Sequence, residues 1–175
     1  LHKDAFLERI RRSSLGFVPR AIVHLGAISS TTERNLDLLM ENNYRYTQEL
    51  ALFCGRSGAR FIYASSASTY GDGHEGYSDD ESLLERYRPL NPYGYSKHVF
   101  DLWAARQGLL GSIVGLKFFN VYGPREAHKG RMASVVYQSW KQIRATGGMK
   151  LFRSTDPRFA DGGQLRDFEA EKALR

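Results

Sequence analysis

Three short apolar runs separated by helical patterns constrain the fold of this chain more than any other feature. The runs are AIVHLGA at 21–27, ARFIYASS at 59–66 and SIVGLKFFNVYGP at 112–124. Short apolar runs that end in small or polar residues are typical of strands buried in a parallel sheet. Because strands that alternate with helices form βαβ units with right-handed crossovers, the sequence predicts an α/β fold, a parallel sheet flanked by helices.

The segments between these runs carry helix signals. The capping pattern ISSTTERN precedes apolar and small residues at helical spacing from Leu36 to Cys54, and Gly55 and Gly58 predict the end of that helix. Pro92 suits the first turn of a helix expected to run to about residue 107. The remaining expected elements are a short basic helix within 1–20, a long polar surface loop at 70–89, a helix over 132–146 and a strand at 149–152. After residue 167 we expect either a short charged helix or a frayed end.

Composition narrows the class of protein. The chain has 175 residues, is 42% hydrophobic and carries a net charge of +6, which fits one globular domain with a core. It holds neither an apolar run long enough to span a membrane nor a signal-peptide pattern. Its single cysteine, Cys54, excludes an internal disulfide, fits a reducing compartment and is interpreted as a buried structural thiol. The positive charge forms no basic stripe, so an anionic small molecule is favoured over nucleic acid as a ligand.

Polar clusters follow each of the three predicted strands. They are GAISSTT, SSASTYG and FNVYGPREAHKG, and a fourth polar segment, NPYGYSK, opens the helix at residue 92. Ligands of open α/β sheets bind beyond the carboxyl ends of the strands. The four segments are therefore expected to converge on one crevice. The histidines are scattered without the spacing of metal ligands, so we expect no metal site.

One tyrosine and one lysine of NPYGYSK have the spacing of a catalytic pair. Residues four apart share a helix face, so Tyr93 lies beside Lys97, whereas Tyr95 points elsewhere. A free phenol has a pKa of about 10 and is a poor base at neutral pH, and a neighbouring ammonium favours its ionised form. A serine from SSASTYG would help to orient the substrate oxygen. Tyrosine and lysine at this spacing also occur by chance on ordinary amphipathic helices.

These residues carry a resemblance to a known family. SSASTYG, YGYSK and FFNVYGPRE resemble the extended branch of the short-chain dehydrogenase/reductase superfamily, the nucleotide-sugar epimerases and dehydratases. GAISSTTE, PLNPYGYSK and FFNVYGPREAHKGRMASV are closer still to the ADP-heptose 6-epimerases of that branch. The resemblance covers about residues 21–168. It implies a Rossmann-like sheet without the family's first βαβ unit and without most of its C-terminal substrate domain, divided here into a partial dinucleotide-binding domain, 1–148, and a substrate-binding start with a divergent tail, 149–175.

The resemblance also implies an activity. Members of this group epimerise C6 of the heptose in ADP-glycero-manno-heptose by transient oxidation and re-reduction with bound NADP, and NAD is the alternative cofactor. It implies an ADP-sugar substrate, a role in lipopolysaccharide precursor synthesis, a cytoplasmic location and a homo-oligomeric full-length parent, without nucleic acid, membrane or metal as a partner.

The resemblance assigns roles residue by residue. Tyr93 is the first acid/base, Lys97 tunes it and holds the nicotinamide ribose, and Ser66 is the active-site serine. Lys129 is a second acid/base on the opposite face, as inversion requires. The implied cofactor-binding residues are Leu25, Gly26, Ala27, Ile28, Ser29, Asn42, Lys97, Val121 and Lys129. The implied substrate-binding residues are Ser66, Asn120, Arg131, Gln138, Phe152, Arg153, Ser154, Thr155 and Arg166.

The sequence also departs from the family pattern. It contains no G-x-x-G-x-x-G motif, the glycine-rich loop that binds a pyrophosphate at a helix N-terminus. Two further readings therefore remain: another nucleotide-sugar epimerase or dehydratase of the branch, and an inactive truncated homologue that only binds nucleotide. We expect the chain alone to turn over little or no ADP-heptose, and we expect an exposed sheet edge that invites association.

Overall fold

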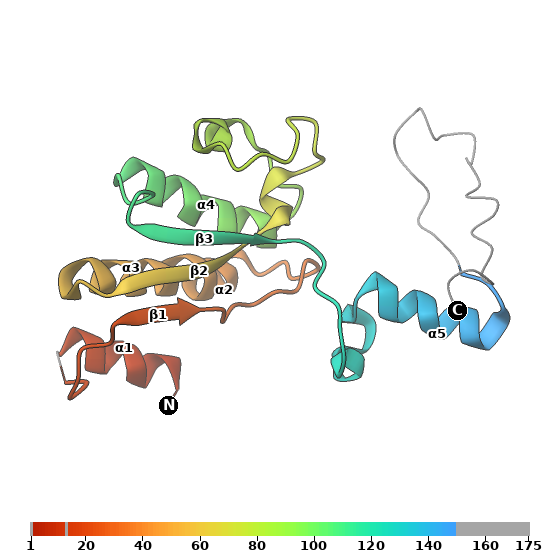
Figure 1. The fold of residues 1–175 in the computed structure, drawn as a ribbon, viewed down its shortest axis with the longest axis horizontal. Coiled ribbons are helices and arrows are strands. Elements are labelled where there is room, and N and C mark those ends of the chain that lie inside the picture. Colours follow the sequence, from red (N-terminus) through yellow and green to blue (C-terminus); the bar gives the residue numbers. More distant parts are fainter. Residues whose placement is uncertain (1, 13, 150–175) are drawn as a thin grey trace. The chain divides into compact units, whose positions relative to one another are not determined.

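The computed structural model describes residues 2–12 and 14–149 and contains a parallel sheet of three strands (Figure 1). The strands are β1 (Ala21–His24), β2 (Arg60–Ser66) and β3 (Ile113–Phe118), in the order β1-β2-β3. Val23 pairs with Ile62, which pairs with Val114 on the other side. The predicted parallel α/β sheet is therefore confirmed, and β1 and β3 form the edges of its described part.

Two strands are shorter than the apolar runs predicted. After His24 the chain leaves the sheet, because the Asn43 side chain takes both backbone groups of Ile28 in hydrogen bonds of 2.9 Å. After Phe118 the chain leaves β3, because the next residue, Phe119, joins an aromatic group with Tyr70 and Tyr77. In both places a side-chain contact from another element competes with sheet pairing.

The expected helices connect and flank the strands. They are α1 (Lys3–Arg11), α2 (Leu36–Leu39), α3 (Tyr46–Ser57), α4 (Pro92–Arg106) and α5 (Val135–Thr146). The helix expected from residue 36 is interrupted by the π-helical segment η1 (Met40–Arg45). It ends at Gly58, whose φ of 73° lies in the left-handed region that glycine adopts without strain.

One face of the sheet is covered by helices. Figure 1 shows α2, α3 and α4 behind the strands, and inner side chains of α3 and α4 form one core with α1 and β2. The fully packed members of this core are Leu7, Ile10, Leu50, Ala51, Cys54, Phe61, Tyr63, Phe100 and Ala104. Burial raises the pKa of the Cys54 thiol to about 11, which keeps it protonated, as expected of a structural thiol.

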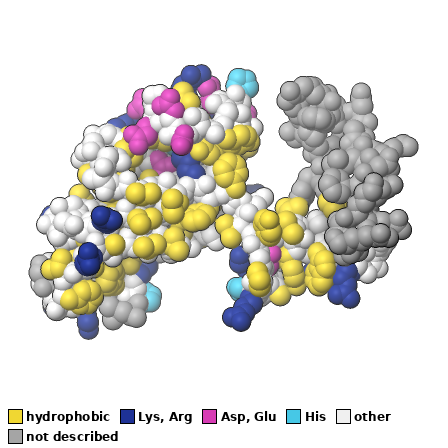
Figure 2. All heavy atoms as spheres, in the orientation of Figure 1, with side chains coloured by type: hydrophobic (Ala, Val, Ile, Leu, Met, Phe, Trp, Pro, Cys, Tyr) yellow, Lys and Arg dark blue, Asp and Glu magenta, His cyan; other side chains and the backbone are white. Residues whose placement is uncertain are grey.

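The opposite face of the sheet is apolar and open. Val23, Val114 and Leu116 are 59%, 51% and 40% exposed. Figure 2 shows hydrophobic side chains gathered over the strands on this face. In its described part the chain therefore buries one side of the sheet and presents the other to solvent. No described helix is long and apolar enough to cross a membrane.

The polar segment at 70–89 has a small core of its own. It joins two 3-10 helices, η2 (Ala67–Tyr70) and η3 (Glu81–Arg86), and it buries Tyr70, Leu84 and Tyr87 together. Gly71 has a φ of 73°, and a Cβ there would lie 2.0 Å from the backbone oxygen of Arg88. The segment is thus an organised surface loop whose acidic side chains face solvent in Figure 2.

The chain divides into two compact units, 1–121 and 122–175. The described part of the second unit contains the 3-10 helix η4 (Glu126–Met132) and α5. Glu126 joins them: its carboxylate accepts hydrogen bonds of 2.7 Å from the backbone N–H and the hydroxyl of Ser134, the residue that caps α5. Because of this cap, α5 begins at residue 135 and not at the expected residue 132. The domain boundary expected after residue 148 stays a prediction.

Candidate active site

Helix α4 begins at the carboxyl end of β2 because three residues of its sequence favour that start. The Asn91 side chain accepts a hydrogen bond of 2.8 Å from the backbone N–H of Gly94, and Pro92 occupies the first turn. A Cβ on Gly94 would lie 2.7 Å from the backbone oxygen of Ser68. Glycine at this position therefore allows the first turn of α4 to pack directly against η2.

The two residues of the predicted pair lie on the buried face of α4. Tyr93 is 9% and Lys97 5% exposed, whereas Tyr95 is 54% exposed. The expectation that Tyr93 shares a face with Lys97 and that Tyr95 points elsewhere agrees with this burial. The Lys97 amine donates a hydrogen bond of 2.9 Å to the backbone oxygen of Ala64 in β2. Burial lowers the pKa of Lys97 to about 8, and the charge of Asp101 opposes that change.

Ser66 is the last residue of β2 and the cap of η2. Its hydroxyl oxygen accepts a hydrogen bond of 3.1 Å from the backbone N–H of Ser68, and it is 7% exposed. Its backbone oxygen accepts a hydrogen bond of 2.7 Å from the hydroxyl of Thr69. Ser65, the neighbouring serine, donates instead to Asp101 on the helix side of the sheet. Of these two serines, Ser66 is the one whose hydroxyl does not hold α4 to the sheet.

Asp101 is a central residue that the sequence analysis missed. It is 2% exposed and accepts hydrogen bonds from Tyr63 and Ser65, both of 2.8 Å, and from the Lys117 amine at 2.7 Å. Lys117 also donates to the Thr69 hydroxyl at 2.8 Å. Burial and the Asp101 charge raise the pKa of Tyr63, so its phenol stays protonated and donates to the carboxylate. The sequence signal was present, because Asp101 follows Lys97 by four residues on the same helix face.

The segment after β1 is held close to the first turn of α4. The Asn43 side-chain amide forms hydrogen bonds with both backbone groups of Ile28. It also donates a hydrogen bond of 3.0 Å to the Ser96 hydroxyl, which in turn donates one of 2.7 Å to the backbone oxygen of Tyr93. Asn43 is 1% exposed. The expected cofactor residue Asn42 is its half-buried neighbour, and its side-chain amide donates a hydrogen bond of 2.7 Å to the backbone oxygen of Leu38. This role of Asn43 was not predicted from the sequence.

His24, the last residue of β1, is buried beside the same helical segment. His24 is buried, and its Nε2 lies 3.0 Å from the Thr47 hydroxyl oxygen. Burial, and then the charge of Lys97, lowers the pKa of His24 to about 4. His24 is therefore neutral near pH 7. The remaining expected residues of this segment, Leu25, Gly26, Ala27 and Ser29, are exposed beyond the end of β1.

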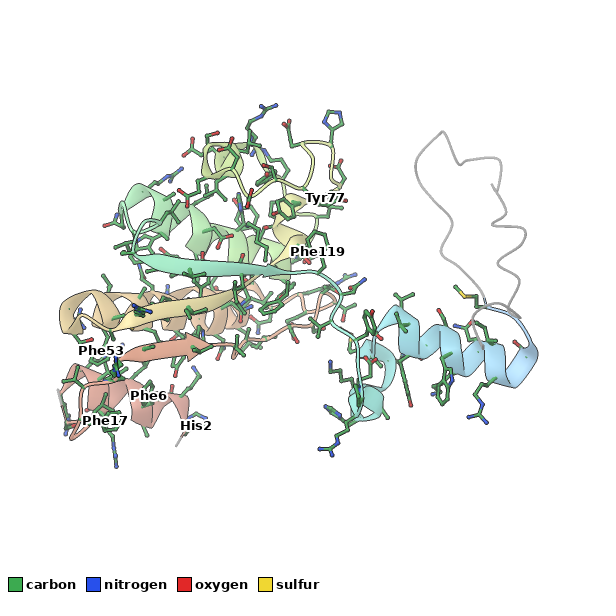
Figure 3. The ribbon with its side chains drawn as sticks, viewed as in Figure 1. His2, Phe6, Phe17, Phe53, Tyr77 and Phe119 are labelled. Atoms are coloured by element: carbon green, nitrogen blue, oxygen red, sulfur yellow. The ribbon has the colours of Figure 1, made fainter. Side chains whose placement is uncertain are left out.

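The end of β3 is fixed by aromatic contacts. Figure 3 shows Phe119 beside Tyr77 of the 70–89 loop, and their ring centroids lie 5.8 Å apart. Phe119 also stacks near Tyr70 at 6.1 Å. The expected ligand-binding residues Asn120 and Val121 follow directly and are exposed. The end of β3 therefore lies beside Tyr70 of η2, the 3-10 helix that follows β2.

The other expected site residues lie outside this first unit. Lys129 and Arg131 are exposed residues of η4. The Gln138 side chain of α5 donates a hydrogen bond of 2.6 Å to the backbone oxygen of Gly130. Phe152, Arg153, Ser154, Thr155 and Arg166 lie outside the described residues. Within the described ranges no group of three His, Cys, Asp or Glu side chains could hold a metal ion. The first unit contains Ser66, Tyr93, Lys97 and the segment at 25–29.

A family model, described as the NAD dependent epimerase/dehydratase family, matches residues 8–169. The chain belongs to this family. Among curated epimerases it is 55% identical over 168 residues to the ADP-L-glycero-D-manno-heptose-6-epimerase of Nitratidesulfovibrio vulgaris, covering 96% of this chain and 52% of the relative. It is 53% identical over 151 residues to the enzyme of the same name from Fusobacterium nucleatum, covering 85% and 46%. The chain spans about half the length of the curated relatives it matches.

Solved epimerase structures have a similar fold. The ADP-L-glycero-D-manno-heptose-6-epimerase of Helicobacter pylori matches with a TM-score of 0.66 and 33% identity, over 79% of this chain and 42% of that one. The UDP-glucuronic acid 4-epimerase of Bacillus cereus, solved in complex with NAD, matches with a TM-score of 0.56 and 26% identity, over 83% and 42%. The Rossmann-like epimerase fold is therefore shown.

Proposed function

We propose that this chain carries the catalytic groups of a nucleotide-sugar epimerase that inverts C6 of the heptose in ADP-glycero-manno-heptose. The observation that carries the proposal is the burial of Tyr93 and Lys97 on one face of α4, at the end of the strand that delivers Ser66. The activity for which relatives at 55% and 53% identity are named supports the choice of sugar.

The residues of the first unit suit acid/base chemistry at a secondary alcohol. Oxidation of C6 requires that a proton leave its hydroxyl oxygen, and we assign that proton to the Tyr93 phenol. The Ser66 hydroxyl holds the same oxygen, and the Lys97 ammonium supplies the positive charge beside the pair. Re-reduction from the other side needs a second proton carrier, a role that we assign to Lys129. Both proton transfers are thus carried by this chain's own side chains.

The donor groups of the first unit fit the nicotinamide half of a dinucleotide. An ammonium has three donors, and in the described part of the chain Lys97 uses one of them, on Ala64. The exposed backbone at 25–29 lies beyond the end of β1, where dinucleotides bind in such sheets. When bound, NADP or NAD would supply the hydride acceptor and donor. The residues proposed to hold it are those of 25–29, Asn42, Val121, Lys97 and Lys129.

The proposed substrate contacts follow the resemblance residue by residue. We assign Ser66 and Asn120 to the sugar, and Arg131, Gln138, the 152–155 segment and Arg166 to the rest of the ADP-sugar, because arginine suits a diphosphate. We further propose that the reaction serves lipopolysaccharide core precursor synthesis in the cytoplasm and that the full-length parent is a homo-oligomer; the resemblance to heptose epimerases supports both proposals.

Calorimetric titration of the purified chain with NADP⁺ and with NAD⁺ tests the cofactor part of the proposal. We expect micromolar binding of one of them that weakens at least tenfold in Lys97→Ala. Tyr93→Phe should bind nearly normally, because the phenol acts on the substrate. Tyr95→Phe is the matched control, since Tyr95 lies exposed on the same turn. Absence of binding by a folded wild-type chain would favour the inactive homologue over the epimerase.

Substrate choice is tested separately. In a coupled assay, any form of the protein that turns over a sugar nucleotide should epimerise ADP-heptose faster than UDP-glucose, and Lys129→Ala should abolish the reaction. Preference for UDP-glucose, or activity that survives Lys129→Ala, would favour another epimerase of the same branch.

A further inference from the structure

The buried acid Asp101 links three elements of the first unit. It belongs to α4 and accepts hydrogen bonds from Tyr63 and Ser65 of β2 and from Lys117 of β3. Each donor lies within 2.8 Å of a carboxylate oxygen, and Asp101 is 2% exposed. A buried carboxylate that accepts hydrogen bonds from three donors restricts both the position of its helix over the sheet and the rotation of that helix about its axis.

The same network reaches the serine end of the site. Lys117 donates to Thr69, whose hydroxyl donates to the backbone oxygen of Ser66. The chain of contacts therefore runs from α4 through β3 to the end of β2. It connects the helix that carries Tyr93 and Lys97 with the residue that carries the serine hydroxyl.

Gly115 makes room for this network. It lies in β3 opposite Tyr63, and a Cβ at residue 115 would lie 2.5 Å from the Tyr63 hydroxyl oxygen. Any side chain there would push the phenol away from Asp101. The glycine in the strand is thus explained by the hydrogen bond between Tyr63 and Asp101.

We propose that Asp101 is a positioning residue for the Tyr93–Lys97 pair: it ties α4 to β2 and β3 and sets a negative charge one helical turn beyond the Lys97 amine. The proposal rests on the proposed roles of Tyr93 and Lys97. Asp101 touches neither substrate nor cofactor in this scheme; it acts through Lys97, whose charged form it favours.

The charges around Lys97 allow a sharp test. Tyr93 and Asp101 lie near Lys97 on its own helix, α4. His24 of β1 is neutral near pH 7. Lys117 of β3 is a second cation that binds Asp101. Removing the Asp101 charge should lower the pKa of Lys97, because burial then acts on the amine unopposed. Removing the Lys117 charge should raise the pKa of Lys97, because Lys97 is then the cation next to Asp101. The two changes are therefore expected to move the Lys97 titration in opposite directions.

The experiment is an NMR titration of the full chain labelled with ¹³C at the lysine side chains, with Lys97→Arg used to assign the signal. In Asp101→Asn the Lys97 midpoint should fall by roughly one pH unit, the ordinary effect of a nearby opposite charge. In Lys117→Met it should rise, while the amides of α4 keep their protection from hydrogen exchange, because Tyr63 and Ser65 still hold Asp101. Glu85→Gln is the control, since Glu85 pairs with Arg106 on the exposed surface.

A merely structural role would give a different pattern. General loosening of α4 exposes Lys97 and raises its midpoint in every variant, so a rise in Asp101→Asn overturns the proposal, as does an unchanged midpoint. If Asp101→Asn does not fold, Lys117→Met decides: a raised midpoint with intact α4 protection supports the proposal, and any other result overturns it. Failure of the wild-type chain to bind NADP⁺ or NAD⁺ would count against the proposed function without changing the Lys97 midpoint.

Discussion

Helices α4 and α5 start in the same way but are held very differently. Each is opened by a polar side chain that accepts a hydrogen bond from the backbone three residues on, Asn91 for α4 and Ser134 for α5. Eight residues of α4 are buried, whereas none of the described residues of α5 is. The comparison teaches that the cap decides where a helix begins, and that packing decides whether its side chains are fixed well enough to act together.

The largest expected difference between the two helices comes from removing a buried partner. Asp101→Ala should lower the free energy of unfolding of the first unit by about 3 kcal/mol or more, because Lys117, Tyr63 and Ser65 lose their shared acceptor. Trp140→Ala in α5, where the indole is 50% exposed, should change it by less than about 0.5 kcal/mol. Urea unfolding followed by circular dichroism measures both, and equal losses would contradict the comparison.

The next effect is a dependence of stability on pH. His24 titrates at about 4 in the folded chain and near 6.5 when unfolded, so the unfolded chain binds more protons between these values. Stability should therefore rise with pH from 4 to 6.5, by on the order of 2 kcal/mol. Lys97, with a folded pKa of about 8 against 10.5, should add a second rise above pH 8. His24→Gln should flatten the acid part of the urea-midpoint profile, and His74→Gln, at an exposed position, should not.

These buried groups show how much the sequence alone could predict. The strand runs, the Pro92 start of α4 and the shared face of Tyr93 and Lys97 follow from local spacing, and the structure agrees with them. The network around Asp101 joins residues that are 16 to 38 positions apart. Spacing within α4 puts Asp101 on the face of Lys97, but it contains no information on the partners of Asp101 in β2 and β3, or on those of Lys117 and Asn43, so the network was missed.

A smaller effect is expected from Gly94. Its replacement by alanine would place a Cβ 2.7 Å from the Ser68 oxygen and force the first turn of α4 away from η2. We expect a loss of about 2 kcal/mol, within the range of overpacking, together with weaker cofactor binding because Lys97 shifts with the helix. Gly148→Ala, where a Cβ meets nothing within 4 Å, is the control beyond α5. Wild-type affinity in Gly94→Ala would show that the close approach is not required.

The smallest effect is expected from the two caps themselves. Asn91→Ala and Ser134→Ala should each cost about 1 kcal/mol of helix stability. The loss at Asn91 should lower the melting temperature of the first unit, because α4 belongs to its core. The loss at Ser134 should appear only as faster hydrogen exchange in α5 and η4. Melting curves combined with amide exchange separate the two, and a shared response would mean that the helices unfold as one.

The π-helical segment at Met40–Arg45 has a consequence for changes in chain length. A π turn holds one residue more than the α turn it replaces. Deleting one residue there allows the helix to close into a continuous α-helix while its beginning at Leu36 and its end at Gly58 stay in place. Leu50 and Cys54 would keep their places in the core, but the amide of Asn43 would turn away from Ile28. A shortened chain of this kind would fold and yet lose the Asn43 hydrogen bonds that link the segment after β1 with α4.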